Sequence, residues 1–351
     1  MAEARRVTAA QLRAFIARAF GAVGIAEHEA ETIAELMTRA DLNGSDGHGV
    51  FRLPQYIRRV EGGAVNVKPK IHVEREAAGM ALVDGDNGMG HLVMRFAAEK
   101  AIEKARGAGC AWVGVKWSNH AGPASLYASM PIAHGMIGLY LAVGNANHLA
   151  AWGGLDMLLS TNPIAVGIPT GEELPIVLDM ATTVAAYGKV KTAAQRGEAM
   201  PEGWMIDRQG RPLTDPKRAA EGLLLPIGGY KGYGLALVFG LLAGTLNGAA
   251  MGRDVVDFNA DDTTATNTGH VIVAINVEAF RPLAEFKASI DQLIRDIRGS
   301  KRLPGFDAVR LPGELSHAKR RDRDANGIPI PPALRDSLDK LATELGIPAL
   351  G

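Results

Sequence analysis

Apolar residues recur at helical spacing near both ends of the chain. Within the first 42 residues they form two successive stripes, each typical of the packing face of a helix. Thr8 and Gln11 are spaced as a capping box at the start of the first helix. A short basic helix is predicted over 54–61, with a proline at its start, and another helix over 332–345. Both ends of the chain are therefore expected to be helical.

The middle of the chain changes from helical spacing to short β-rich runs. Strands are predicted at 81–83, 111–115, 137–143, 176–178 and 271–277, and helices at 91–106, 124–134 and 284–298. Helices separate the first three strands, and this alternation is typical of an α/β fold. The charged stretch 310–329 has no clear period and is expected to be a loop.

A glycine-rich turn follows the first of these strands, but its spacing is not that of a dinucleotide fingerprint. It reads Gly85-Asp86-Asn87-Gly88-Met89-Gly90, whereas a Rossmann turn requires G-x-G-x-x-G. The chain has no P-loop motif, and its nine histidines include no pair at the spacing of a zinc site. The pattern alone would suit a doubly wound Rossmann sheet, yet the missing fingerprint leaves the cofactor open.

The composition favours a small metabolite over a polymer as the partner. Apolar residues make up 47% of the 351 residues, and 38 basic residues balance 38 acidic ones. A neutral chain has no general attraction to nucleic acid or to an anionic membrane. The single cysteine excludes an intrachain disulfide, and the longest apolar stretch, 235–246, is shorter than the roughly 20 residues that span a bilayer. With no apolar leader in the first residues, we expect a cytoplasmic protein.

The most informative segment is Ser45-Asp46-Gly47-His48-Gly49-Val50-Phe51-Arg52-Leu53-Pro54-Gln55-Tyr56. His48, Arg52 and Tyr56 are spaced by four residues, so they share one face if a helix begins near His48. A histidine moves protons near neutral pH, and the arginine fork matches a carboxylate. Together they suit a 2-oxo acid. The alternative interpretation is a helix cap and a surface ion pair of Arg52 with Glu61 or Asp46.

A second cluster, Lys116-Trp117-Ser118-Asn119-His120-Ala121-Gly122, follows a predicted strand. Loops at strand ends of α/β folds often carry ligand contacts. Asn119 and His120 are therefore candidates for substrate binding and catalysis. The alternative is that both side chains satisfy backbone groups of the loop.

These two segments belong to an ordered series that resembles the malate/L-lactate dehydrogenase family without a Rossmann fold. That family includes L-sulfolactate dehydrogenase, ureidoglycolate dehydrogenase, diketogulonate reductase and piperideine-2-carboxylate reductase. The resemblance runs over nearly the whole chain, and the other segments that carry it are 152–154, 160–163, 178–183, 187–189, 228–232 and 311–314.

The resemblance implies hydride transfer between NAD or NADP and C2 of a small 2-oxo or 2-hydroxy acid. His48 matches the proton donor of the family's reductases, Arg52 the anchor of the substrate carboxylate, and His120 a histidine that serves as the base in some members. Tyr56, Asn119 and Thr161 are the expected substrate contacts, and no metal is implied. The cofactor contacts map onto Asp179, Met180, Ala181, Thr182, Thr183, Tyr230, Lys231, Gly313 and Glu314.

The resemblance also implies an architecture, which we prefer to the Rossmann alternative. It is an α/β fold in which a central, largely antiparallel sheet binds the cofactor, with a helical domain built from both ends of the chain. The expected boundaries are 1–78 for the first part of the helical domain, 79–304 for the cofactor domain, and 305–351 for the returning segment. A homodimer would complete the active site at its interface.

Two positions depart from the family pattern. Gly47 stands where the family usually has serine, so a hydroxyl that polarises His48 must come from Tyr56 or from water. Lys189 stands where the cyclic-imine reductases carry an acid, which favours a 2-hydroxy acid as the substrate. The alternatives are reduction of a cyclic imino acid or a sugar-derived diketo acid, or a non-catalytic metabolite-binding relative. The substrate's tail, the preferred direction, the choice between NAD and NADP, and the histidine that transfers the proton stay open.

Overall fold

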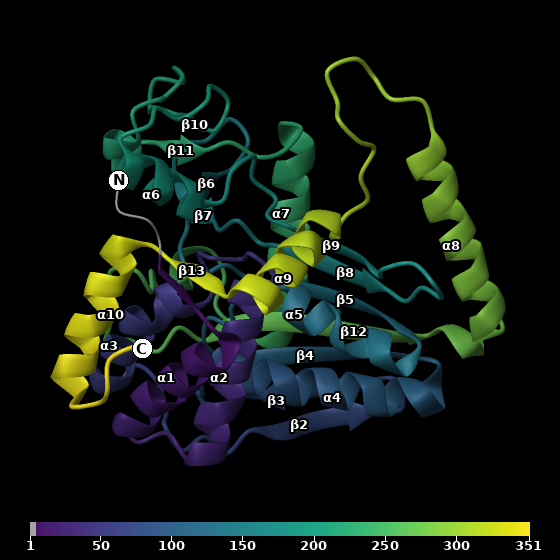
Figure 1. Ribbon diagram of the computed structural model, residues 1–351, viewed down its shortest axis with the longest axis horizontal. Coiled ribbons are helices and arrows are strands. Elements are labelled where there is room, and N and C mark those ends of the chain that lie inside the picture. Colours follow the sequence, from purple (N-terminus) through teal and green to yellow (C-terminus); the bar gives the residue numbers. More distant parts are fainter. Residues whose placement is uncertain (1–4) are drawn as a thin grey trace.

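The computed structural model describes residues 5–351, apart from the side chains at positions 195 and 196. Its centre is a seven-stranded sheet (Figure 1). The strand order is β2 (His72–Ala77), β3 (Met80–Asp84), β4 (Cys110–Ser118), β12 (Thr268–Asn276), β5 (Met136–Ala142), β8 (Ile164–Ile168) and β9 (Ile176–Met180). Only β3 and β4 pair in parallel, and all other neighbours are antiparallel. The predicted largely antiparallel sheet is confirmed.

The middle strand β12 is covered on both faces, which explains its continuous apolar run. Ile272 and Ala274 pack into the core shared with α4 (Gly90–Ala108). Val271 and Val273 belong to a second core, with residues of α7 (Tyr230–Ala243). Because successive side chains of a strand point to opposite faces, a strand buried on both sides needs apolar residues at every position.

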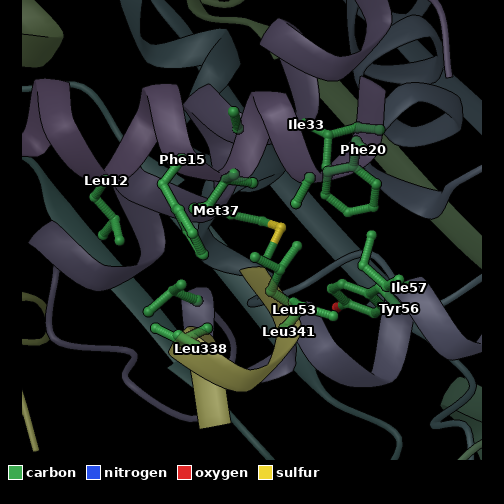
Figure 2. Packing of buried hydrophobic residues seen from close by; sticks show 14 of the residues in the cluster. Leu12, Phe15, Phe20, Ile33, Met37, Leu53, Tyr56, Ile57, Leu338 and Leu341 are labelled. Atoms are coloured by element: carbon green, nitrogen blue, oxygen red, sulfur yellow. The ribbon is translucent and has the colours of Figure 1, made fainter. Parts of the chain in front are cut away.

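Both ends of the chain share one hydrophobic core. Figure 2 shows side chains of α1 (Ala9–Ala22), α2 (Glu27–Leu42) and α3 (Leu53–Glu61) packed against Leu338 and Leu341 of α10 (Pro332–Leu345). The short strands β1 (Arg5–Val7) and β13 (Ile328–Ile330) also pair with each other. A helical domain built from both ends of the chain would make these contacts. The exact boundaries of that domain stay a prediction.

Local signals placed several helix ends correctly and missed other helices. The capping box of Thr8 and Gln11 is present at the start of α1. The predicted helix over 124–134 is a short α5 (Ser125–Ala128) followed by the 3₁₀ helix η2 (Met130–His134). The predicted helix over 284–298 is α8 (Leu283–Gly299), while α6 (Tyr187–Arg196) and α7 were not predicted as helices.

The loop predicted over 310–329 is wrong, because this stretch contains α9 (Glu314–Asn326). Arg323 is the one buried residue of α9, so the helix lacks the apolar stripe on which the prediction depended. The remaining elements are short: β6 (Leu149–Ala150) with β7 (Met157–Leu159), β10 (Met205–Ile206) with β11 (Leu223–Leu224), and the 3₁₀ helices η1 (Val50–Arg52), η3 (Pro216–Glu221), η4 (Thr245–Asn247), η5 (Gly252–Asp254) and η6 (Val277–Ala279). Within residues 5–351, no helix has both the length and the apolar character needed to span a membrane.

Candidate active site

The loop after α2 is held in place by a buried carboxyl group. The Asp41 side chain accepts a hydrogen bond of 2.8 Å from the backbone N–H of Val50. Gly49 packs directly against this carboxyl group, and a Cβ at that position would overlap it. The close contact explains the glycine after His48, since any larger residue would displace the start of η1.

The pKa of Asp41 predicts how stability changes with pH. Burial, reinforced by nearby Asp46, raises this pKa to about 8. Between about pH 4 and pH 8 the folded chain therefore retains a proton that the unfolded chain has lost. This carboxyl group contributes its full stability below about pH 4 and loses it as the pH rises toward 8.

Asp41→Asn should remove that pH dependence while keeping an oxygen for the Val50 N–H. In urea unfolding, the free energy of unfolding of Asp41→Asn minus that of the wild type should increase from pH 5 to pH 8. The buried histidines titrate in both proteins, so the difference isolates Asp41. A difference that is constant across this range would show that Asp41 is ionised in the folded chain.

His48, Arg52 and His120 line one cavity of about 150 Å³. The His48 and His120 rings are stacked, with centroids 5.6 Å apart and planes 11° apart. On its other side His120 stacks on Phe258 at 4.9 Å. The structure therefore brings together two loops that are far apart in the sequence and places both histidines at the same cavity.

Hydrogen bonds fix the orientation of His120. Its Nδ1 lies 2.5 Å from the Tyr56 hydroxyl and accepts a bond of 3.3 Å from the backbone N–H of Gly122. A backbone N–H can only donate, so Nδ1 is an acceptor here and the ring proton is on Nε2. The Tyr56 hydroxyl can donate or accept, and it can therefore stay bonded when Nδ1 becomes protonated.

Both histidines are neutral at neutral pH. Burial, together with the nearby Arg52 cation, lowers the pKa of His48 to about 4. Burial also holds the pKa of His120 well below its usual range, with added contributions from His48 and Arg52. An anion bound at Arg52 would offset part of this effect and raise both pKa values.

Arg52 has polar neighbours but no acidic partner within the described residues. Its Nε donates to the Gly47 carbonyl at 3.0 Å, and Nη1 donates to Gln55 Oε1 at 2.7 Å and Asn259 Oδ1 at 3.2 Å. The alternative surface ion pair with Glu61 or Asp46 is wrong, because Arg52 forms no ion pair with the described residues and Asp46 pairs with Arg323. Nη2 makes no hydrogen bond to the described residues, so a partly buried cation at the cavity has donors to spare.

Comparison with known proteins identifies the family. The model of the family described as malate/L-lactate dehydrogenase matches residues 7–339. The chain belongs to the malate/L-lactate dehydrogenase family. The malate dehydrogenase of Pyrococcus abyssi is 37% identical over 98% of this chain and 96% of its own. The L-sulfolactate dehydrogenase of Methanocaldococcus jannaschii is 36% identical over 92% of each chain.

A solved relative confirms the fold. The structure of malate dehydrogenase from Pyrococcus horikoshii superimposes with a TM-score of 0.90 at 35% identity, over 99% of this chain and 97% of the other. The chain is thus a dehydrogenase of a family of NAD(P)-dependent 2-hydroxy-acid dehydrogenases. The family uses both cofactors, because an Escherichia coli relative is named for NAD(+) and a Chromohalobacter salexigens relative for NADP(+).

Asn119 and Tyr56, two of the three expected substrate contacts, do not line the cavity. Asn119 is buried, and its amide donates to the backbone carbonyls of Asn87 and Gly88 and accepts from Thr266. It supports the 85–90 turn, so we do not retain it as a substrate contact. Tyr56 reaches the cavity only through His120. Thr161 does line the cavity.

The predicted cofactor segments meet around the end of β9. The Thr182 N–H donates to the Thr161 carbonyl at 3.0 Å, and the Ile227 N–H donates to the Thr182 carbonyl at 2.9 Å. Ile227 immediately precedes the turn that leads to Tyr230 and Lys231. The side chains of Asp179, Tyr230 and Lys231 are exposed, whereas the hydroxyls of Thr182 and Thr183 donate to backbone carbonyls.

Gly313 joins this group from the C-terminal segment. It has a φ of 96°, and a Cβ there would approach the backbone of Val177 in β9 to 3.1 Å. Glu314 is held by Arg298 at 2.7 Å, and Met180 and Ala181 are partly buried. The structure therefore places the three predicted cofactor segments beside β9, at one edge of the sheet.

Sequence reasoning missed several cavity residues. Tyr140, His148, Tyr187, Phe258, Asn259 and His270 all line the cavity. His270 had a detectable signal, as a polar residue within the apolar run of β12, and its Nδ1 bonds the Tyr140 hydroxyl at 2.7 Å. His91, fully buried beside Tyr56, was also missed, and both its ring nitrogens lack a partner among the described residues.

Two further features concern the departure at Gly47 and the binding of metal ions. A Cβ at Gly47 would meet nothing within 4 Å, so the serine usual in the family would fit there. In the part of the chain that the structure describes, no group of three His, Cys, Asp or Glu side chains could hold a metal ion.

Proposed function

We propose that this dehydrogenase interconverts a small 2-oxo acid and the matching 2-hydroxy acid by hydride transfer at C2. The observation that carries the proposal is the cavity itself, where Arg52 has no acidic partner and lies beside two stacked, neutral histidines. A buried cation without a counter-charge is costly, and a substrate carboxylate would compensate it. Nη2 of the guanidinium would then hold the carboxylate and so orient C2 and its oxygen toward the histidines.

The bound nicotinamide would supply or accept the hydride. The rest of the chemistry belongs to side chains of this chain. In reduction, a carboxylate on Arg52 raises the pKa of His120, so that the ring can carry protons on both nitrogens, with Nδ1–H donating to Tyr56. Nε2–H then passes its proton to the oxygen on C2, and the ring returns to neutral. In oxidation the ring must first change to the tautomer that carries its proton on Nδ1, with Tyr56 as the acceptor, and Nε2 would then take the hydroxyl proton.

We propose His120 as the proton-transfer group because it alone of the two histidines has a hydrogen-bonded partner on the ring. Its Nδ1 is held by Tyr56, whereas the His48 ring makes no hydrogen bond to the described residues. An oriented imidazole presents Nε2 in one direction, which efficient proton transfer requires. His48 would form the wall against which His120 stacks.

We propose that the cofactor lies along β9 and not on the glycine-rich turn. The backbone N–H groups of Gly85, Asp86, Asn87 and Gly88 all donate within the protein, so these four are not available to a pyrophosphate. The exposed Lys231, in the first turn of α7, offers a cation and a helix N-terminus instead. A structure with bound cofactor whose pyrophosphate lies on the 85–90 turn would overturn this placement.

An assay of the purified chain tests the function. Reduced nicotinamide, as NADH or NADPH, should be oxidised in the presence of one or more 2-oxo acids. Cofactor binding without turnover of any substrate would favour the non-catalytic alternative. Faster turnover of a cyclic imino acid or of a sugar-derived diketo acid would favour the other enzymatic alternatives.

We also propose a homodimer that buries one face of α7. This helix is apolar on all sides, and Leu235, Val238 and Leu241 are exposed on it, with Leu246 just beyond its end (Figure 1 shows α7 beside the sheet). A helix that is apolar all round is normally buried on all sides, and an exposed apolar patch of this kind marks an interface.

Val238→Glu should convert the dimer to a monomer without unfolding the chain. A charge at the centre of an apolar interface cannot be hydrated once the interface forms, so association becomes unfavourable. Light scattering after gel filtration should show half the wild-type mass, with an unchanged far-ultraviolet circular dichroism spectrum. Lys340→Glu on the exposed face of α10 is the control for added negative charge. A wild-type mass for Val238→Glu would place the interface elsewhere.

A further inference from the structure

A tyrosine and a histidine that the proposed proton transfer does not use share a hydrogen bond in the cavity wall. Tyr140, in β5, and His270, in β12, are both buried and both line the cavity. The Tyr140 hydroxyl lies 2.7 Å from His270 Nδ1, and His270 Nε2 lies 3.3 Å from the backbone carbonyl of Asn119. The pair therefore belongs to a short hydrogen-bonded chain that leads from the cavity into the protein.

The direction of these hydrogen bonds follows from the groups involved. Burial lowers the pKa of His270 to about 4, so its ring carries a single proton at neutral pH. A carbonyl can only accept, so that proton is on Nε2, and Nδ1 accepts from the Tyr140 hydroxyl. Burial also raises the pKa of Tyr140, as does the nearby Asp179 carboxylate, so the hydroxyl stays protonated. With its proton donated to His270, the Tyr140 oxygen can act toward a ligand only as an acceptor.

This acceptor is held in place and is not used by the protein itself. Tyr127 stacks on the Tyr140 ring, with centroids 5.6 Å apart, and the Tyr127 hydroxyl donates to the Ala121 carbonyl at 2.6 Å. The Tyr140 hydroxyl makes no other hydrogen bond to the described residues. Arg52 supplies the cavity with donors, whereas Tyr140 supplies an acceptor for a ligand group that carries N–H or O–H.

Tyr140 also faces the side of the sheet along which the cofactor is proposed to lie. The strands β5, β8 and β9 lie side by side (Figure 1), and Tyr140 pairs with Ala165, which in turn pairs with Asp179. Residues opposite one another on neighbouring strands point to the same face of a sheet. The backbone at Tyr140 is thus two strand spacings, about 10 Å, from the predicted cofactor contact Asp179, with only the small Ala165 between them in that row.

We propose that the Tyr140 oxygen accepts a hydrogen bond from the carboxamide amino group of the nicotinamide, with His270 holding the hydroxyl proton away from the cofactor. This inference rests on the proposed function. The carboxamide is attached to the ring carbon next to the one that carries the hydride, and its amino group is a donor. The other donor in the reaction, the hydroxyl of a 2-hydroxy acid, is assigned to His120. A hydrogen bond to the carboxamide would fix which face of the nicotinamide ring is turned toward C2.

Cofactor analogues that differ in the carboxamide test this assignment by calorimetry, without turnover. In the acetylpyridine analogue a methyl group replaces the amino group, whereas the thionicotinamide analogue retains the amino group. Tyr140→Phe should lower the affinity for the natural oxidised cofactor and for the thionicotinamide analogue by about 3- to 10-fold, because one hydrogen bond is lost. The affinity for the acetylpyridine analogue should fall by less than about 2-fold. The phenylalanine ring keeps the stacking on Tyr127, and thermal unfolding checks the fold.

Two substitutions of His270 test its positioning role with the same ligands. His270→Gln keeps an amide oxygen that can accept the Tyr140 proton, so it should retain the preference for the natural cofactor over the acetylpyridine analogue. His270→Leu should lose that preference, since the Tyr140 hydroxyl could then donate to the carbonyl that both cofactors share. A merely structural role for His270 would change the affinity for both cofactors by the same factor.

The outcomes separate this inference from the proposed function. Tyr233→Phe removes a tyrosine hydroxyl outside the cavity and should leave the affinity for all three cofactors unchanged. Equal losses for all three cofactors in Tyr140→Phe would assign Tyr140 to the packing of the cavity, and no loss for any would mean that another group binds the carboxamide. Either result overturns the inference while the proposed function stands. If the wild type binds neither NAD nor NADP, the proposed function fails and this inference fails with it.

Discussion

Replacing His120 with alanine is expected to lower kcat by about 10²–10⁴-fold, the usual cost of losing a general acid or base. The reason is geometric, because this ring lies in the cavity with its Nδ1 held by Tyr56 at 2.5 Å. The loss should appear in kcat and in kcat/KM alike, since the interaction is made mainly in the transition state. The measurement is steady-state turnover of the best 2-oxo acid with reduced nicotinamide.

Tyr56→Phe and His48→Ala refine this test. Removing the Tyr56 hydroxyl should shift the pH profile of kcat, because the Nδ1 proton of the imidazolium loses its acceptor. His48→Ala should cost less than His120→Ala, since the His48 ring makes no hydrogen bond to the described residues. His134→Ala changes an exposed histidine outside the cavity and serves as the control. If His48→Ala is the more damaging variant, the roles of the two histidines are reversed.

The first part of the candidate site could be predicted from the sequence because two of its residues are local to each other. His48 and Arg52 lie within one helical turn of each other, and glycines flank the histidine. Contacts between residues that are far apart in the sequence leave no such local pattern. Asn259 reaches Arg52 from 207 residues away, and Lys191 reaches Asn259 across 68 residues. A side chain that acquires its role from such a distant partner looks like an ordinary surface residue in the sequence.

The difference between local patterns and distant contacts also explains which elements of the fold were predicted correctly. The strand β12 is buried on both faces, and its apolar run was detectable without knowledge of its neighbours. The helix α9 is held by polar contacts to distant residues, among them that of the buried Arg323 with Asp46, 277 residues away. Its charged sequence therefore looked like a loop. Elements stabilised by their own amphipathic pattern were predictable, and this helix, held by polar contacts with distant residues, was not.

Arg52→Lys is expected to lower kcat/KM by about 10-fold or more for every 2-oxo acid, whatever its tail. The carboxylate that adjoins C2 is common to all of these substrates. The loss corresponds to one hydrogen bond to a charged group, worth about 1.5–3 kcal/mol. Folding and cofactor affinity should be nearly unchanged, since Arg52 forms no ion pair with the described residues and is not among the predicted cofactor contacts. Thermal unfolding and the fluorescence of bound NADH or NADPH measure these two properties.

Several contacts hold the Arg52 guanidinium in one orientation. Three donors of the guanidinium already hold it in place through Gly47, Gln55 and Asn259, and the group lies 5.2 Å from the centre of the Phe258 ring. Nη2 remains for the substrate, in a fixed direction. A lysine has no planar group to be held by several partners at once, so its charge would move within the cavity.

Arg58→Lys provides the matched control for Arg52→Lys. Arg58 lies in the adjoining α3, is exposed, and pairs with Asp262 at 3.2 Å, so its replacement should leave kcat/KM unchanged. An Arg52→Lys enzyme with wild-type kcat/KM would mean that another group holds the C1 carboxylate. Lys191, whose Nζ shares Asn259 Oδ1 with Arg52 Nη1, would then be the first candidate.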